Sequence, residues 1–166
     1  MRTKTCLFIL LSLSLSAYSQ NYWQQAVDYK MEVDIDVKTF KYSGKQELLY
    51  TNNSPDSLKK VFYHLYFNAF QPGSEMSDRI KKGKDKNKRF RIDIDSLEPN
   101  EVGYLKVSNL KQDGNVLKHE LSETILEVSL SKPLIPGETT KLTLDFEGQI
   151  PKLVRRAGRN SSEGVA

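Results

Sequence analysis

Residues 28 to 39, DYKMEVDIDVKT, decide the fold class because apolar and charged side chains alternate in them without a break. A period of two residues is that of a β-strand with one face turned to a core. The stretch therefore predicts a half-buried antiparallel strand. Its predicted inner face consists of Tyr29, Met31, Val33, Ile35 and Val37.

The residues that follow predict a hairpin. A turn is expected from Phe40 to Gly44, and a second strand from Lys45 to Thr51, KQELLYT. The run from Asn52 to Ser57, NNSPDS, then predicts a further turn, because Asn and Asp tolerate left-handed backbone and Pro fixes one torsion. The chain thus begins as an antiparallel pair of strands.

Residues 58 to 70, LKKVFYHLYFNAF, are apolar or aromatic on both faces. Such a run predicts a central strand covered on both sides. A helix is the alternative, but the β-branched and aromatic content and the stop at Pro72-Gly73 favour a strand.

Further strands are expected in the second half of the chain, separated by turn signals. The dipeptide Asp113-Gly114 is a strong hairpin signal, and residues 134 to 138, LIPGE, predict another turn. Short strands at regular spacing indicate an all-β single domain, either an antiparallel β-sandwich or a saddle-like open sheet. The expected strands are Gly103 to Leu110, Leu117 to Leu121, Thr124 to Leu130 and Thr140 to Phe146.

The amino-terminal residues predict a secretory signal peptide over residues 1 to 19. Arg2 and Lys4 precede an apolar run, and small residues lie three apart before a cleavage point after Ser19. Cys6 is the only cysteine and lies inside this segment, so residues 20 to 166 form the expected domain without disulfides. We therefore expect an exported protein, periplasmic, on the outer surface or secreted, held together by its core.

The charge of the chain is concentrated in one segment. The formal net charge is +4, of which Arg2 and Lys4 belong to the predicted signal. Residues 79 to 91, RIKKGKDKNKRFR, hold eight Lys or Arg and one Asp. Nucleic acid, an acidic glycan or a membrane surface could bind such a segment, but a solvated loop is the favoured interpretation, since only Phe90 offers a stacking platform.

The stretch KHELSET, residues 118 to 124, contains part of a zinc-protease pattern. In H-E-x-x-H two His ligands lie four residues apart on a helix, whereas here Glu123 stands four residues after His119. We expect His119 and Glu120 in a strand that pairs across the Asp113-Gly114 turn. A solvated strand residue is then the preferred interpretation of His119.

The remaining polar residues predict no catalytic, cofactor-binding or metal-binding site. His64, within aromatic residues, is expected to be a partly buried imidazole bonded to backbone or Asn partners. Glu32, Asp34 and Asp36 are expected on a solvated strand face, since calcium needs six to eight oxygen ligands, usually from a loop. Nucleophile elbows, phosphate-binding glycine loops and CxxC pairs are absent from the sequence.

Several phrases together resemble one family. They are residues 22 to 76, with F-x-Y-x-G-K, TNNSPDSL and HLYFNAF, then GYLKVSNLKQDGN from Gly103 and IPGETTKLTLDFEGQIP from Ile135. In this order they resemble the opening of exported M1-family zinc metallopeptidases, of the aminopeptidase N and leukotriene A4 hydrolase type. The resemblance implies a saddle-shaped N-terminal β domain that packs on a thermolysin-like catalytic domain and walls its cleft.

The resemblance also implies what this chain lacks. Zinc belongs to the H-E-x-x-H of the catalytic domain, a motif that the sequence does not contain, so the chain alone is expected to be inactive and free of cofactor. Its expected partner is that catalytic domain in cis, with peptide substrate only in the full-length protein, no nucleic acid and no membrane span. We expect a C-terminally truncated domain whose ending, RRAGRNSSEGVA, departs from better-known relatives. The alternative is a free-standing secreted β-sandwich that binds a glycan or a protein.

Overall fold

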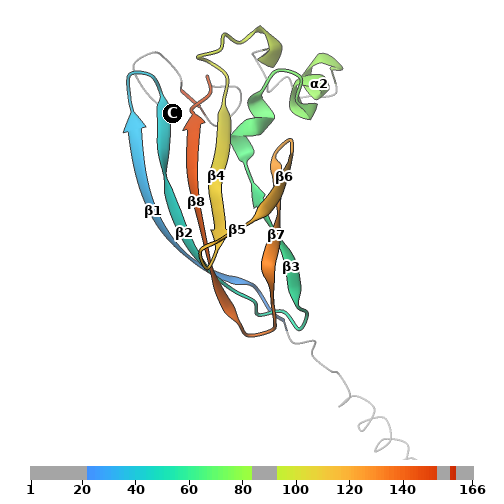
Figure 1. Cartoon of the computed structure of the whole chain (residues 1–166). Helices are drawn as coiled ribbons and strands as arrows, with labels where there is room; N and C mark the ends of the chain where they lie inside the picture. The colour runs from blue at the N-terminus through green and yellow to red at the C-terminus, as the bar shows by residue number, and fades with distance from the viewer. Residues whose placement is uncertain (1–21, 84–92, 153–157, 160–166) are drawn as a thin grey trace, which may run out of the picture.

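The computed structural model describes residues 22–83, 93–152 and 158–159. The predicted signal peptide, most of the basic segment and most of the carboxyl-terminal stretch lie outside these residues. Two antiparallel sheets face each other, and short helical segments gather at one end of them (Figure 1). The all-β prediction is confirmed, as an open sandwich whose two layers differ in size.

The larger sheet has five strands in the order β1-β2-β8-β4-β5. The smaller one has three, in the order β3-β7-β6. The strands are β1 (Ala26–Asp36), β2 (Lys41–Thr51), β3 (Leu58–His64), β4 (Tyr104–Gln112), β5 (Asn115–Val116), β6 (Lys118–Ser122), β7 (Ile125–Leu134) and β8 (Thr139–Gln149). The helical segments are the 3-10 turn η2 (Tyr66–Phe70), the helix α2 (Glu75–Lys81) and the 3-10 turn η3 (Ile94–Ser96).

The first hairpin is confirmed, with an earlier turn than predicted. Strand β1 ends at Asp36 and β2 begins at Lys41. The Asp36 carboxylate accepts hydrogen bonds from the amides of Lys38 and Thr39, at 2.8 and 3.2 Å, and from the Thr39 hydroxyl at 2.7 Å. Phe40 completes the turn with a positive φ of 58°. Asp36 thus stops the strand, and Val37 belongs to the turn.

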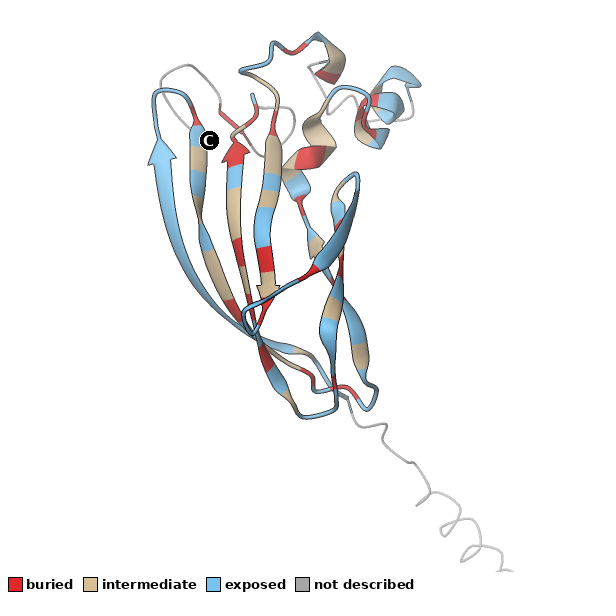
Figure 2. Cartoon of the chain, viewed as in Figure 1, coloured by how far each residue is buried: buried red, intermediate tan, exposed pale blue. Residues whose placement is uncertain are grey.

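The alternating strand β1 is not half-buried, contrary to the sequence prediction. Every residue from Ala26 to Asp36 is exposed, and Figure 2 shows the strand as pale blue along its length. Strand β1 forms the outer edge of the larger sheet, and β2 is the one described strand that pairs with it. The smaller sheet lies on the side of β4 and β5, away from β1, and leaves this edge uncovered (Figure 1).

The core lies between the two sheets. Leu142 and Leu144 of β8 are 0% and 4% exposed, as the alternation of that segment predicts. Val61 and Leu65 reach them from the other layer. Burying such side chains contributes roughly 1.5 to 3 kcal/mol each. The remaining fully packed members are Leu48, Leu110, Leu117, Leu126 and Val128.

The aromatic run from Leu58 to Phe70 is not one central strand. Strand β3 stops at His64, and the chain continues as the 3-10 turn η2. Strand β3 is an edge of the smaller sheet, with β7 in the centre. The two apolar faces of the run are therefore not both covered. Leu65 is buried in the core, whereas Phe62 and Tyr66 are 63% and 68% exposed.

The segment after Asp113-Gly114 also differs from the prediction. Only β5, two residues long, pairs back onto β4. The chain then crosses to the smaller sheet, where β6 pairs with β7. Leu117 marks the crossing, since its amide bonds to the carbonyl of Leu110 at 3.0 Å while its side chain is buried. The turn at Asp113-Gly114 therefore leads into a connection between the two sheets and not into a long hairpin.

Candidate functional site

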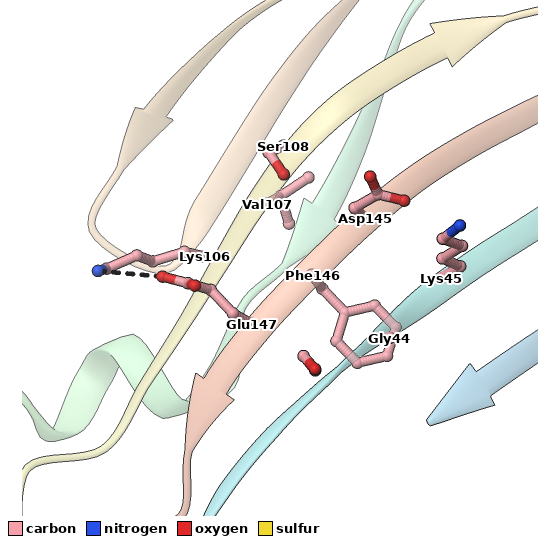
Figure 3. Close-up of a pocket in the computed structure, with 9 residues that line it drawn as sticks. Gly44, Lys45, Lys106, Val107, Ser108, Asp145, Phe146 and Glu147 are labelled. Carbon is pink, nitrogen blue, oxygen red and sulfur yellow. Dashed lines mark ion pairs between the residues drawn. The ribbon is translucent and has the colours of Figure 1, made fainter. Parts of the chain in front are cut away.

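Two hollows on the described surface could receive a ligand or partner. One is a polar hollow of about 590 Å³ on the outer face of the larger sheet (Figure 3). The other is an aromatic pocket of about 490 Å³ at the helical end of the sandwich. The side chains that line each hollow indicate which of the two is the better candidate for a binding site.

The polar hollow presents charges that already compensate each other. Lys106 and Glu147 form an ion pair of 3.3 Å, and Figure 3 shows their side chains pointing toward each other. The Asn109 amide donates to the Asp145 carboxylate at 2.6 Å. Both ion-pair partners are more than half exposed, so the pair is screened by water. These groups do not converge on a common point, as a binding site requires.

The aromatic pocket has an apolar floor and a charged rim. The rings of His64 and Tyr66 stack with centroids 3.9 Å apart, and those of Phe67 and Phe70 lie 6.5 Å apart. Its lining comes from the end of β3, from η2, from α2 and from the turn between β6 and β7: His64, Tyr66, Phe67, Ala69, Phe70, Glu75, Met76, Arg79, Glu123 and Thr124. Apolar walls with a few polar groups are typical of ligand and partner sites.

Asn68 holds the 3-10 turn of the pocket in place. This side chain is 6% exposed, and its oxygen accepts from the Leu105 amide at 2.8 Å and from Gln71 at 3.1 Å. The Leu65 amide donates to the carbonyl of Thr124 at 2.7 Å. A buried amide that lost these partners would cost about 1 to 3 kcal/mol, so η2 is firmly attached to β4 and to the β6–β7 turn.

Helix α2 is placed by caps at its amino terminus. Ser74 accepts from the amide of Ser77 at 3.2 Å, and the Glu123 carboxylate accepts from the amide of Glu75, also at 3.2 Å. A carboxylate at the start of a helix is favoured by the helix dipole. Met76 and Ile80 pack beneath, in a small second core with Ile94, Leu97, Phe70 and Val102. Helix α2 is therefore held at its amino terminus and along its apolar side.

Two tyrosines of the sandwich, Tyr42 and Tyr63, are partly buried. Tyr42 lies with its ring 6.4 Å from that of Phe67 and 6.2 Å from that of Phe146. Burial, and secondarily the nearby Tyr104, raises the pKa of Tyr42 to about 12. Burial also raises the pKa of Tyr63, with a smaller contribution from Tyr29. These phenols stay neutral at physiological pH and act as packing groups.

The KHELSET stretch is a strand and a turn. His119 is exposed on β6 opposite Val128 of β7, so the predicted pairing across the Asp113-Gly114 turn is wrong, while its place on a strand is confirmed. Glu123 lies in the following turn with a φ of 51° and caps α2. The sequence holds no signal for this role, because the capped helix lies about fifty residues away.

The other polar residues considered in the sequence lie on separate elements and form no common site. His64 is exposed at the end of β3, so the prediction of a partly buried imidazole is wrong. Glu32 and Asp34 are exposed on the outer face of β1. Arg79 and Lys81 belong to α2, which corrects the expected loop for the first part of the basic segment.

Metal and membrane features are limited to what the described residues show. Within residues 22–83, 93–152 and 158–159, no three His, Cys, Asp or Glu side chains come together in a way that could hold a metal ion. None of the helices in this part of the chain is long and apolar enough to cross a membrane.

Solved structures with a similar arrangement exist. The likeness is to M1 zinc metallopeptidases. A mutant enzyme from Deinococcus radiodurans matches with a TM-score of 0.46 and 18% identity, over 75% of this chain and 21% of that chain. A two-domain M1 zinc metallopeptidase mutant bound to L-tryptophan matches with 0.47 and 18%, over 76% and 21%. No protein-family model and no curated protein matches the sequence.

The chain spans about a fifth of the length of the solved structures. At such identities and TM-scores, the likeness establishes no activity for this chain.

Proposed function

We propose that this chain is the N-terminal β domain of an exported M1-type zinc metallopeptidase that removes residues from the amino termini of peptides. In such an enzyme a zinc-bound water, with a Glu as base, performs the cleavage in a separate catalytic domain. The role of the β domain is to support that catalytic domain and to wall its cleft. The signal-like residues 1 to 19 support export.

One observation carries the proposal. The phrase HLYFNAF, which contributes most to the sequence resemblance, lines the aromatic pocket and leaves Tyr66 68% exposed. Exposed aromatic side chains next to a pocket are typical of protein contact surfaces. Asn68 and the caps of α2 hold this surface rigid before any partner arrives, which lowers the entropic cost of docking.

The second candidate is a free-standing secreted β-sandwich that binds a glycan or an extracellular protein. The basic segment of residues 79 to 91 favours this alternative, because its eight Lys or Arg side chains would attract an acidic ligand. It differs from the first proposal in requiring no catalytic domain.

The coding sequence around this chain separates the two candidates. The peptidase proposal expects the reading frame to continue into G-x-M-E-N and then H-E-x-x-H. A stop codon after Ala166, with no such sequence nearby, would favour the binding module. A metal assay on the purified chain is expected to show no stoichiometric zinc and no aminopeptidase activity.

Docking at the aromatic pocket can be tested with two exposed aromatic residues. Tyr66→Ala is expected to weaken binding of a separately produced catalytic domain by about tenfold or more, as for an interface anchor. Phe62→Ala is the matched control, since Phe62 is 63% exposed but lies outside the pocket. Isothermal titration measures both. Equal effects of the two substitutions would place the interface elsewhere.

A further inference from the structure

Strand β1 presents a free backbone edge. Among the described strands it is the outermost of the larger sheet and pairs with β2 alone, over all eleven residues from Ala26 to Asp36. Within the described residues, no backbone hydrogen bond outside that ladder involves residues 26 to 35. In an edge strand, alternate N–H and C=O groups point away from the sheet, ready to pair with another strand.

The inner face of this edge is apolar and uncovered. Tyr29 lies opposite Leu48, which is 3% exposed, so the apolar residues of β1 share the face that carries the core. Tyr29, Met31, Val33 and Ile35 are nevertheless 57%, 49%, 51% and 53% exposed. A continuous row of exposed apolar side chains is a feature of interaction surfaces rather than of free strands.

The outer face of the same edge is acidic. Lys30 is the only basic residue on it, against four carboxylates. None of these four forms an ion pair with a described residue, and Asp36 is occupied by the turn. The carboxylates are Asp28, Glu32, Asp34 and Asp36. Across β2, Glu32 and Asp36 lie opposite Lys45 and Lys41, whereas Asp28 and Asp34 have no basic residue opposite them. Carboxylates without a basic residue opposite them attract a cationic neighbour and repel an acidic one.

This charge pattern argues against a second copy of the chain as the neighbour. Two copies of β1 could pair antiparallel about a two-fold axis, with the apolar faces on one side. Every such register that aligns nine or more residues of β1 sets one carboxylate opposite another, because Asp28 then lies opposite Glu32, Asp34 or Asp36. Like charges directly opposite each other destabilise a strand pair.

We propose that β1 binds an extended segment of a protein partner by strand addition, and that this segment alternates apolar with basic residues. Its backbone pairs with the free edge, its apolar side chains cover the row from Tyr29 to Ile35, and its Lys or Arg side chains lie beside the carboxylates. Main-chain bonds supply affinity in this mode and alternate side chains supply selectivity. The inference does not rest on the proposed function, because β1 and the aromatic pocket share no residue.

The probe for this site is a fluorescent eleven-residue peptide in which lysine alternates with valine. We expect saturable binding to the full chain by fluorescence anisotropy, and weaker binding of a peptide in which glutamate replaces lysine. Val33→Lys is expected to lower the affinity about tenfold or more, because it sets a charge in the apolar row. Val116→Lys is the matched control, as an equally small residue that is 77% exposed on β5.

Two further measurements decide the mode of binding. Methylation of alternate backbone nitrogens of the lysine-valine peptide is expected to abolish binding, because it removes the donors that would pair with β1. Glu32→Lys is expected to reduce the preference for the lysine peptide over the glutamate peptide. The proposal is overturned if the methylated peptide binds equally well, if Val33→Lys and Val116→Lys behave alike, or if the chain forms a dimer through β1.

Discussion

Strands β1 and β8 belong to the same sheet and show the same alternation, yet they differ in environment. The residues Met31, Gln46 and Leu144 lie in one row across β1, β2 and β8, on the same face. Leu144 is 4% exposed and Met31 is 49% exposed. Alternation therefore tells which face of a strand is apolar, whereas the position of the second layer decides whether that face is buried.

The largest expected loss of stability follows from a substitution at the buried end of this row, and the exposed end provides the comparison. Leu144→Ala is expected to lower the free energy of unfolding by about 3 kcal/mol, through lost burial and a residual cavity. Met31→Ala, at the exposed end, is expected to cost below about 0.5 kcal/mol. Urea unfolding monitored by circular dichroism measures both. Similar losses for the two variants would mean that β1 is covered.

A second comparison concerns neighbouring asparagines after β2. Asn52 is fully buried, and its side chain donates to the carbonyls of Asp56 and Leu134 at 2.8 and 2.9 Å. Asn52→Ala is expected to cost about 2 kcal/mol, because it leaves buried groups without partners. Asn53 is exposed and holds only the segment before β1, through the carbonyl of Gln24. Asn53→Ala should remain within about 0.5 kcal/mol of the unmodified chain in the same urea experiment.

The third prediction concerns the pH dependence of stability and two carboxylates in turns, Asp113, which binds β8, and Asp36, which ends β1. The Thr140 hydroxyl, and then the Lys141 amide, hold the pKa of Asp113 below its ordinary value of 3.8. A lowered pKa stabilises the fold above the ordinary value, and this contribution is lost as the pH falls through the lowered one. Asp113→Asn is expected to cost about 1 kcal/mol at pH 7, a modest figure because the group is largely solvated. Below pH 3.8 the difference between variant and unmodified chain should shrink.

Asp36 provides the control for that experiment. The Thr39 hydroxyl and the amides of Lys38 and Thr39 lower the pKa of Asp36 in the same direction. Since this carboxylate is fully exposed beside the open strand, Asp36→Asn is expected to change stability less than Asp113→Asn across the same pH range. Thermal unfolding at several pH values measures both. If Asp36→Asn changed stability as much as Asp113→Asn or more, the expected difference between the turn after β1 and the turn that binds β8 would be wrong.

Local pattern was enough to predict most of the strands. The alternation in residues 28 to 36 and 140 to 146, together with the turn residues of NNSPDS and LIPGE, predicts β1, β8 and the all-β class correctly. The helix α2 was not predicted. Its apolar residues Met76 and Ile80 are few, and its caps come partly from Glu123, which is distant in sequence.

The candidate site was less accessible to prediction than the fold. The sequence predicts a strand for the phrase HLYFNAF, whereas the observed 3-10 turn depends on Asn68, whose partners include Leu105. The exposure of β1 could not be predicted because it depends on where the smaller sheet ends. Sheet order and layer position arise from contacts between distant segments, which a local period does not encode.

The most direct test of the open edge is thiol reactivity along the row across β1 and β8. In a Cys6→Ser background, which removes the only cysteine, Met31→Cys and Leu144→Cys are labelled separately under native conditions. We predict that Met31→Cys reacts within about tenfold of the unfolded chain, and Leu144→Cys about a hundredfold or more slower, since a buried thiol reacts only on opening. Equal protection of the two thiols would contradict the account, because it would show that the apolar face of β1 is already covered.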